Sequence, residues 1–180
     1  MTHSEPSIPH TTPNVVLTGF SGTGKSTVGR FIAQRLGFGF VDTDLLIEAR
    51  WGPIPAIFAE QGEATFRSLE RIVAAELSLL SKLVIATGGG TLLNDRNVTT
   101  LGRSGHIVCL CASPQTILER VSRRPGTRPL LAGANPAETI ACLLAERAGA
   151  YAQFDQVDTT GLSHAQVADA ILSLVSDLSD

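Results

Sequence analysis

The chain has 180 residues, which is the length of one ordinary domain. Hydrophobic residues make up 43% and charged residues 17%, a composition typical of globular proteins and unlike that of disordered chains. The net charge of −3 disfavours a general nucleic-acid binder, and no apolar run approaches the roughly 18 residues needed to span a bilayer.

The hydrophobic pattern predicts one folded domain over residues 14–180, preceded by a polar, proline-containing flexible tail over 1–13. Short apolar runs predict five strands, at Val15–Leu17, Phe40–Val41, Leu83–Ala86, His106–Cys111 and Gln156–Asp158. Helical spacing predicts helices at Lys25–Leu36, Leu45–Arg50, Pro55–Leu80 with an interruption near Gly62, from Ser113 onward, Pro136–Phe154 and Ser163–Leu178.

The alternation of short strands with helices is typical of βαβ units. We therefore expect an α/β fold with three αβα layers around a five-stranded parallel sheet. Ligands of such sheets bind at the carboxyl ends of the strands. Three unusual clusters each follow a predicted strand, namely Gly19–Ser26, Asp42–Asp44 and Gly88–Gly90, so all three point to one edge of the sheet.

The first cluster matches the phosphate-binding pattern G-x-x-x-x-G-K-[ST], in which glycines turn backbone N–H groups toward an anion. In this pattern Lys25 reaches the β- and γ-phosphates, and the Ser26 hydroxyl ligates Mg²⁺. The pattern predicts a P-loop NTPase fold that binds a nucleotide with Mg²⁺. The residues expected to bind the nucleotide here are Gly22, Thr23, Gly24, Lys25, Ser26 and Thr27.

The phosphate loop alone does not distinguish a kinase from a GTPase or a motor ATPase. A GTPase needs the base-reading pattern N-K-x-D, which the chain lacks. Motor domains are usually longer. The predicted strand that ends at Ala86 leads into glycines, where commoner NTPases carry a metal-handling acid.

Together these residues resemble the shikimate kinases. The chain shows that family's motifs in the family's order: D-x-D at Asp42–Asp44, G-E-x-x-F-R-x-x-E at 62–70, T-G-G-G at Thr87–Gly90, R-P-L-L at Arg128–Leu131, and R-x-x-x-Y at Arg147 and Tyr151. The resemblance implies a kinase that uses MgATP to phosphorylate the 3-hydroxyl of shikimate, for aromatic amino-acid biosynthesis.

A shikimate site needs cations for a carboxylate and an acceptor near the reacting hydroxyl. Arg67 and Arg147 suit the carboxylate because a guanidinium binds both oxygens. Asp44 is expected to orient the reacting hydroxyl and to take its proton, and Asp42 to contact Mg²⁺ through water. The glycines Gly88, Gly89 and Gly90 let the backbone approach the substrate closely, with Gly89 as the expected contact.

The segment from 123 to 136 is rich in arginine, glycine and proline, and predicts a mobile lid over the phosphates. Arg128 is its candidate for stabilising charge on ATP, and Arg120, on the preceding helix, for flanking the adenine. The alternative is a solvated basic loop. His residues lack metal-ligand spacing, and the three cysteines suit free thiols in a reducing cytoplasm.

The proposed acidic and basic residues also have structural alternatives. Asp42 and Asp44 are suitable turn residues and helix caps. Arg67 is spaced to form helical ion pairs with Glu63 or Glu70.

Two other functions stay open from the sequence. A related small-molecule kinase, such as one acting on gluconate, shares the phosphate loop, but the triple glycine and F-R-x-x-E favour shikimate. A catalytically inactive nucleotide-binding protein is disfavoured because Lys25, Asp44 and Arg67 are all present. We expect a cytoplasmic monomer acting on a small molecule, with neither nucleic acid nor membrane as a partner.

Overall fold

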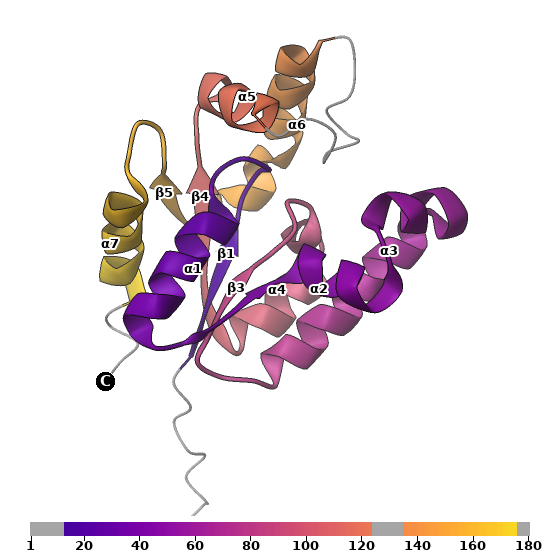
Figure 1. Ribbon diagram of the computed structural model, residues 1–180, viewed down its shortest axis with the longest axis horizontal. Coiled ribbons are helices and arrows are strands. Elements are labelled where there is room, and N and C mark those ends of the chain that lie inside the picture. Colours follow the sequence, from indigo (N-terminus) through magenta and orange to yellow (C-terminus); the bar gives the residue numbers. More distant parts are fainter. Residues whose placement is uncertain (1–12, 124–134, 176–180) are drawn as a thin grey trace, which may run out of the picture.

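A five-stranded, fully parallel sheet lies at the centre of the computed structural model, which describes residues 13–123 and 135–175 (Figure 1). The strand order is β2-β3-β1-β4-β5. The strands span Asn14–Thr18 (β1), Gly39–Asp42 (β2), Leu83–Ala86 (β3), Gly105–Cys111 (β4) and Asp155–Asp158 (β5). The predicted fold class and all five predicted strands are confirmed.

Helices surround the sheet on both faces (Figure 1). They are α1 (Lys25–Leu36), α2 (Thr43–Trp51), α3 (Ile54–Ser78), α4 (Asp95–Gly102), α5 (Pro114–Ser122), α6 (Pro136–Tyr151) and α7 (His164–Val175), with a short 3₁₀ turn, η1, at Thr91–Leu93.

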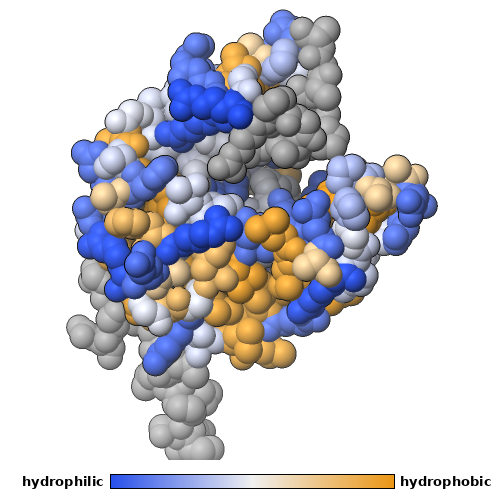
Figure 2. All heavy atoms as spheres, in the orientation of Figure 1, coloured by the Kyte–Doolittle hydropathy of each residue, from blue (hydrophilic) through white to orange (hydrophobic). Residues whose placement is uncertain are grey.

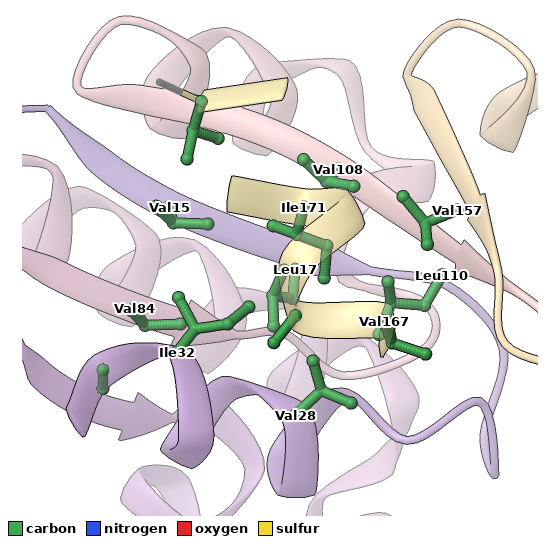
Figure 3. Packing of buried hydrophobic residues seen from close by; sticks show 13 residues of the cluster. Val15, Leu17, Val28, Ile32, Val84, Val108, Leu110, Val157, Val167 and Ile171 are labelled. Atoms are coloured by element: carbon green, nitrogen blue, oxygen red, sulfur yellow. The ribbon is translucent and has the colours of Figure 1, made fainter. Parts of the chain in front are cut away.

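The strands bury apolar side chains on both faces, as parallel strands between two helical layers must. On one face Val15 and Leu17 pack against Val28 and Ile32 of α1 and against α7 (Figure 3). On the opposite face Val16 packs against α2, α3 and α4. A third cluster lies between β4, α5, α6 and the phosphate loop. These packed layers hold the carboxyl ends of the strands at one edge.

Local signals fix several helix ends where they were expected. The Ser113 hydroxyl accepts from the Thr116 N–H at the start of α5, with proline at the first helical position. Gly37 ends α1 with φ 66°. The helical stretch of α3 is interrupted at Gly62, where φ is 80° and ψ is 167°.

Some element bounds differ from the prediction. Helix α2 begins at Thr43, so Asp44 lies in its first turn and not in a loop before it. Helix α6 ends at Tyr151 and not at Phe154. Helix α4 was not predicted, because its segment contains few apolar residues. Residues 1–12 of the predicted tail (1–13) and most of the predicted lid, with Arg128, lie outside the described residues.

The visible surface in Figure 2 is mixed in hydropathy, and its largest apolar area lies in the lower centre, near β2 and α2. Among the described residues, no helix combines the length and the apolar character that crossing a membrane requires. Cys109, Cys111 and Cys142 are free thiols, as expected from their odd number.

Candidate active site

The loop between β1 and α1 folds around the side chain of Lys25. Its ammonium group is buried and donates to the carbonyls of Gly19, at 2.7 Å, and Phe20, at 2.9 Å. Gly19 has a φ of 124°, and a Cβ built there would lie 2.2 Å from the carbonyl oxygen of Leu110 on β4. Only glycine can occupy this position, because its φ is positive and the neighbouring strand leaves no space. The loop is therefore shaped to place a cation inside a ring of backbone groups.

Asp42 joins the end of β2 to the phosphate loop. One of its oxygens accepts from the backbone N–H groups of Asp44, at 3.1 Å, and Leu45, at 3.3 Å, so Asp42 is the N-cap of α2. The other accepts from the Ser26 hydroxyl at 2.6 Å. The Asp42 side chain therefore caps α2 and also contacts Ser26 at the start of α1.

Asp44 carries a carboxylate in an unfavourable environment. Its Oδ1 atom is buried and has no hydrogen-bond partner among the described residues. Burial raises the pKa of Asp44 from 3.8 to about 6, the Asp42 charge adds to this rise, and the Lys25 charge opposes it. A buried, unpartnered carboxylate oxygen with a raised pKa, beside a phosphate loop, is typical of a group that meets a ligand.

The three consecutive glycines after β3 have different neighbours. A Cβ on Gly88 would lie 2.5 Å from Oδ1 of Asp44, and one on Gly90 would lie 2.9 Å from Nη1 of Arg67. A Cβ on Gly89 would make only ordinary contacts, at 3.5 Å to the phosphate loop and 3.6 Å to Arg147. A side chain at position 88 would therefore displace the Asp44 carboxylate, and one at position 90 would displace the flexible end of Arg67, whereas position 89 lies between the phosphate loop and Arg147.

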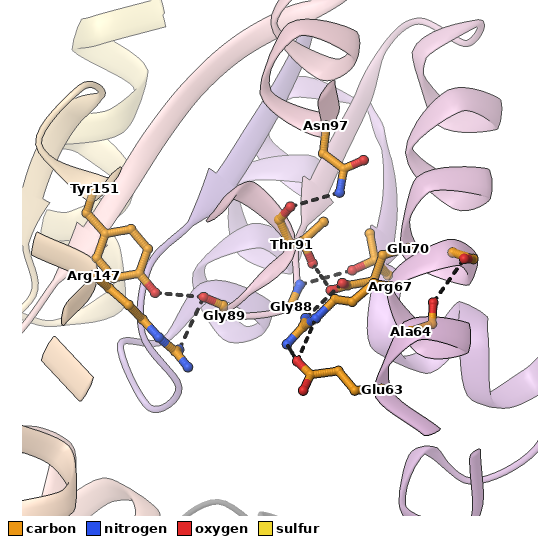
Figure 4. A network of polar contacts seen from close by, with 12 residues as sticks. Glu63, Ala64, Arg67, Glu70, Gly88, Gly89, Thr91, Asn97, Arg147 and Tyr151 are labelled. Atoms are coloured by element: carbon orange, nitrogen blue, oxygen red, sulfur yellow. Dashed lines mark hydrogen bonds and ion pairs between the residues drawn. The ribbon is translucent and has the colours of Figure 1, made fainter. Parts of the chain in front are cut away.

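Arg67 approaches this glycine loop from α3 and is held by two carboxylates (Figure 4). Its guanidinium donates to Glu70 at 2.8 Å and to Glu63 at 2.8 Å and 3.1 Å. Burial alone would lower the pKa of Arg67, but the hydrogen bonds and charges of Glu70 and Glu63 raise it. Glu70 also accepts from the hydroxyl of Thr91 at 2.6 Å and is 2% exposed. The ion pairs expected as a structural alternative are thus present, and they aim Arg67 at the loop.

Arg147 and Tyr151 approach the same loop from α6, on the other side of Gly89 (Figure 4). The Tyr151 hydroxyl donates to the Gly89 carbonyl at 2.7 Å, and Arg147 Nη1 lies 3.4 Å from the same oxygen. The Arg147 guanidinium also lies over the ring of Phe20, 5.3 Å from its centre. Two arginines from distant helices thus flank one glycine loop.

The structure brings most of the predicted site residues to one edge of the sheet. The predicted nucleotide-binding residues Gly22, Thr23, Gly24, Lys25, Ser26 and Thr27 form the phosphate loop and the first turn of α1. Arg120 donates to the hydroxyl and the carbonyl of Thr159 and reaches the Gly22 carbonyl at 3.4 Å, so it lies beside that loop. Its expected contact with adenine stays a prediction.

Four site neighbours were not assigned from the sequence. Phe20 lies under the Arg147 guanidinium, and the Thr43 hydroxyl accepts from the Gly88 N–H at 3.0 Å. The Thr91 hydroxyl donates to Glu70, and the Tyr151 hydroxyl donates to the Gly89 carbonyl. Each lies inside or next to a recognised motif, and that adjacency is the only signal that could have found it.

The comparisons with known proteins agree on one family. The family model described as shikimate kinase matches residues 21–176. A shikimate kinase of Gloeobacter violaceus is 46% identical over 169 residues, which are 93% of this chain and 95% of that protein. The solved structure of a shikimate kinase from Acinetobacter baumannii, in complex with shikimate, is 36% identical, with a TM-score of 0.87 over 94% of this chain and 96% of that one.

A more distant similarity concerns the fold alone. A gluconokinase structure from Sinorhizobium meliloti is 20% identical, with a TM-score of 0.65 over 93% of this chain and 94% of that one. The much higher identity to shikimate kinases, along nearly the whole length, separates the two families. The chain belongs to the shikimate kinase family.

Proposed function

We propose that this chain transfers the terminal phosphoryl group of ATP to the 3-hydroxyl of shikimate, giving shikimate 3-phosphate and ADP, as a cytoplasmic monomer in aromatic amino-acid biosynthesis. One observation carries the proposal most directly. Asp44, Arg67 and Arg147 all approach the Gly88–Gly90 loop, next to the phosphate loop. This arrangement offers an acceptor for a hydroxyl and two cations for a carboxylate around one small space.

The two arginines suit the carboxylate of the substrate. Arg67 is oriented by Glu63 and Glu70, so little side-chain entropy remains to be lost when it binds. Arg147 lies on the opposite side of Gly89. Because guanidinium groups bind carboxylates in a planar, paired geometry, such a clamp fixes the substrate ring and selects acids over neutral sugars.

Asp44 suits the reacting hydroxyl. Its Oδ1 atom has no hydrogen-bond partner among the described residues, and its raised pKa makes it a better proton acceptor than an ordinary aspartate. In the proposed step the 3-hydroxyl oxygen forms a bond to the γ-phosphorus, its proton passes to Asp44, and the bond from the γ-phosphorus to the bridging oxygen breaks to release ADP. Positioning contributes more than early deprotonation in such a loose transition state.

The phosphate loop suits the nucleotide. Lys25 and the backbone N–H groups of Gly22–Ser26 would neutralise charge on the phosphates. A hydroxyl and a carboxylate oxygen of Ser26 and Asp42, 2.6 Å apart, are oxygen donors of the kind that Mg²⁺ accepts, Asp42 through water. Magnesium supplies charge neutralisation on the transferred group. Arg128, outside the described residues, is proposed to add a further positive charge to ATP.

Coupled ADP release with MgATP tests the proposal, using shikimate, quinate, gluconate and no acceptor in parallel. Release that depends on shikimate is the expected result. Release with gluconate alone would contradict shikimate as the substrate. A protein that binds ATP but releases no ADP with any acceptor would overturn catalysis itself.

A further inference from the structure

Tyr151 makes a short contact with the backbone at the centre of the site. Its hydroxyl donates to the Gly89 carbonyl at 2.7 Å. The residue is 6% exposed and belongs to the same buried cluster as Phe20 and Ile140. Burial, as the largest cause, raises the pKa of Tyr151 above its ordinary value of 10, so the hydroxyl stays a hydrogen-bond donor at physiological pH.

Arg147 lies one helical turn before Tyr151 and reaches for the same oxygen. Its Nη1 atom lies 3.4 Å from the Gly89 carbonyl, a long and weak hydrogen bond. Its guanidinium is also placed over the ring of Phe20. The short bond to the Gly89 carbonyl therefore belongs to Tyr151, and the Arg147 guanidinium makes only the long bond to that oxygen.

The Gly89–Gly90 peptide joins the carbonyl that Tyr151 holds to a backbone N–H donor. The N–H groups of Gly89 and Gly90 have no hydrogen-bond acceptor among the described residues. The Gly90 N–H shares one rigid peptide plane with the Gly89 carbonyl, so fixing the carbonyl also fixes the direction of that donor. A hydrogen bond at one end of the plane thus orients a donor at the other.

We propose that Tyr151 is a positioning residue for the substrate carboxylate: its hydroxyl fixes the Gly89 peptide and thereby leaves Arg147 free to bind the carboxylate. The inference rests on the proposed function and adds a residue to it. Without the hydroxyl, the Gly89 carbonyl would lose its best donor. Arg147, whose Nη1 atom already lies 3.4 Å from that oxygen, would move onto it, away from the substrate.

Tyr151→Phe tests this, since it removes one oxygen and keeps the ring in its cluster. We expect the KM for shikimate to rise about tenfold, the size of a lost hydrogen bond to a charged partner, with little change in kcat or in the KM for ATP. A uniform loss in kcat with unchanged KM for shikimate would overturn the proposal.

A substrate analogue separates positioning from general damage. The methyl ester of shikimate lacks the charge that Arg147 binds, so Tyr151→Phe and the wild type should differ little in their KM for this ester. An equal penalty for ester and acid would contradict a role through the carboxylate. Ser104→Ala is the matched control: its hydroxyl donates to the Leu101 carbonyl at 3.2 Å, at the opposite edge of the sheet, and its loss should leave all constants unchanged.

A second measurement needs no substitution and no turnover. Tyr151 is the one tyrosine of the chain, so tyrosine labelled with ¹³C at the ζ carbon gives a single NMR signal. Saturating shikimate should shift this signal, and the methyl ester should shift it less. An unshifted signal in a protein shown by calorimetry to bind shikimate would overturn the inference and leave the proposed function intact. A wild type that neither binds nor phosphorylates shikimate would instead refute the proposed function.

Discussion

At the scale of single residues, the Asp44 carboxylate is buried between the charges of the Asp42 carboxylate and the Lys25 ammonium group. Its pKa of about 6 places its ionisation close to neutral pH, where a general base is most effective. The charged form therefore predominates above about pH 6. We expect kcat/KM for shikimate in the wild type to rise with pH up to this value and then to level off.

Asp44→Asn tests the role of this carboxylate. An amide keeps the shape but cannot accept the proton, so kcat should fall about 10²- to 10⁴-fold, the usual contribution of a general base. ATP affinity, measured by calorimetry, should change little, because the phosphate loop is untouched. Near-normal turnover in Asp44→Asn would show that another group accepts the proton.

The same substitution has a predicted effect on stability. The folded-state pKa of about 6 lies above the ordinary aspartate pKa of 3.8, so the folded state binds the proton more tightly than the unfolded chain. The cost of the buried charge therefore grows as the pH rises from about 4 to about 6, and is complete at neutral pH. At about 1.4 kcal/mol per pKa unit, it amounts to at most about 3 kcal/mol.

The free energy of unfolding of Asp44→Asn at pH 7.5 should consequently exceed that of the wild type by about 1–3 kcal/mol, so the variant should unfold at a higher denaturant concentration. The advantage should shrink as the pH is lowered toward 4. Urea titrations at several pH values measure both. An Asp44→Asn protein that is less stable at pH 7.5 would show that the carboxylate has a favourable partner in the folded state.

Some site residues could be predicted from the sequence, and others could not. Asp44 and Arg67 stand in recognisable patterns, and the structure places both at the glycine loop. Tyr151 and Thr91 carry common hydroxyls whose importance depends on partners 62 and 21 residues away. Nothing in local spacing specifies such partners.

At the scale of elements, the loop after β3 joins three parts of the site. Asp44 of α2 lies against Gly88, and Arg67 of α3 lies against Gly90. The Tyr151 hydroxyl of α6 donates a hydrogen bond to the Gly89 carbonyl. The 3₁₀ turn that follows is tied to α3 through Thr91 and to α4 through Asn97, which donates to the Thr91 carbonyl at 2.8 Å. The loop is therefore fixed from every side by neighbouring helices.

Gly88→Ala tests this tight fit. The added Cβ would lie 2.5 Å from Asp44 Oδ1 and 2.9 Å from the Thr91 hydroxyl, so one or both side chains must move. We expect a loss of about 1–3 kcal/mol in the free energy of unfolding and a fall in kcat, measured by urea titration and steady-state assay.

Gly149→Ala provides the matched control on α6, where a Cβ would meet nothing within 4 Å. It should raise stability by about 1 kcal/mol through helix propensity and leave kcat unchanged. If Gly88→Ala were as active and stable as Gly149→Ala, close approach would not be the reason for glycine at 88.

Elements with strong local signals could be predicted, and elements held by distant contacts could not. Helix α5 carries its own cap in Ser113, and its start was located correctly. Helix α4 has only eight residues, with two threonines that favour helices weakly, and it depends on packing against α3. The start of α2 was misplaced because Thr43 and Asp44 are common turn residues.

At the scale of the whole molecule, the strand order brings the clusters together. β1 lies between β3 and β4, so the phosphate loop after β1 has the glycine loop beside it, and β2 follows on the far side of β3. The sequence could predict that the three clusters share one edge, because all strands are parallel. It could not predict their order along that edge, because strand pairing joins residues 44 or more positions apart in the chain.

The position of the phosphate on the product shows whether the chain phosphorylates the 3-hydroxyl of shikimate. Wild-type protein would be incubated with MgATP and shikimate, and the product examined by ¹H–³¹P correlation NMR. We expect the phosphorus to couple to the proton on carbon 3 of the shikimate ring, because the carboxylate clamp places the 3-hydroxyl beside Asp44 and the γ-phosphate. Phosphate on another hydroxyl, or shikimate recovered unchanged, would contradict it.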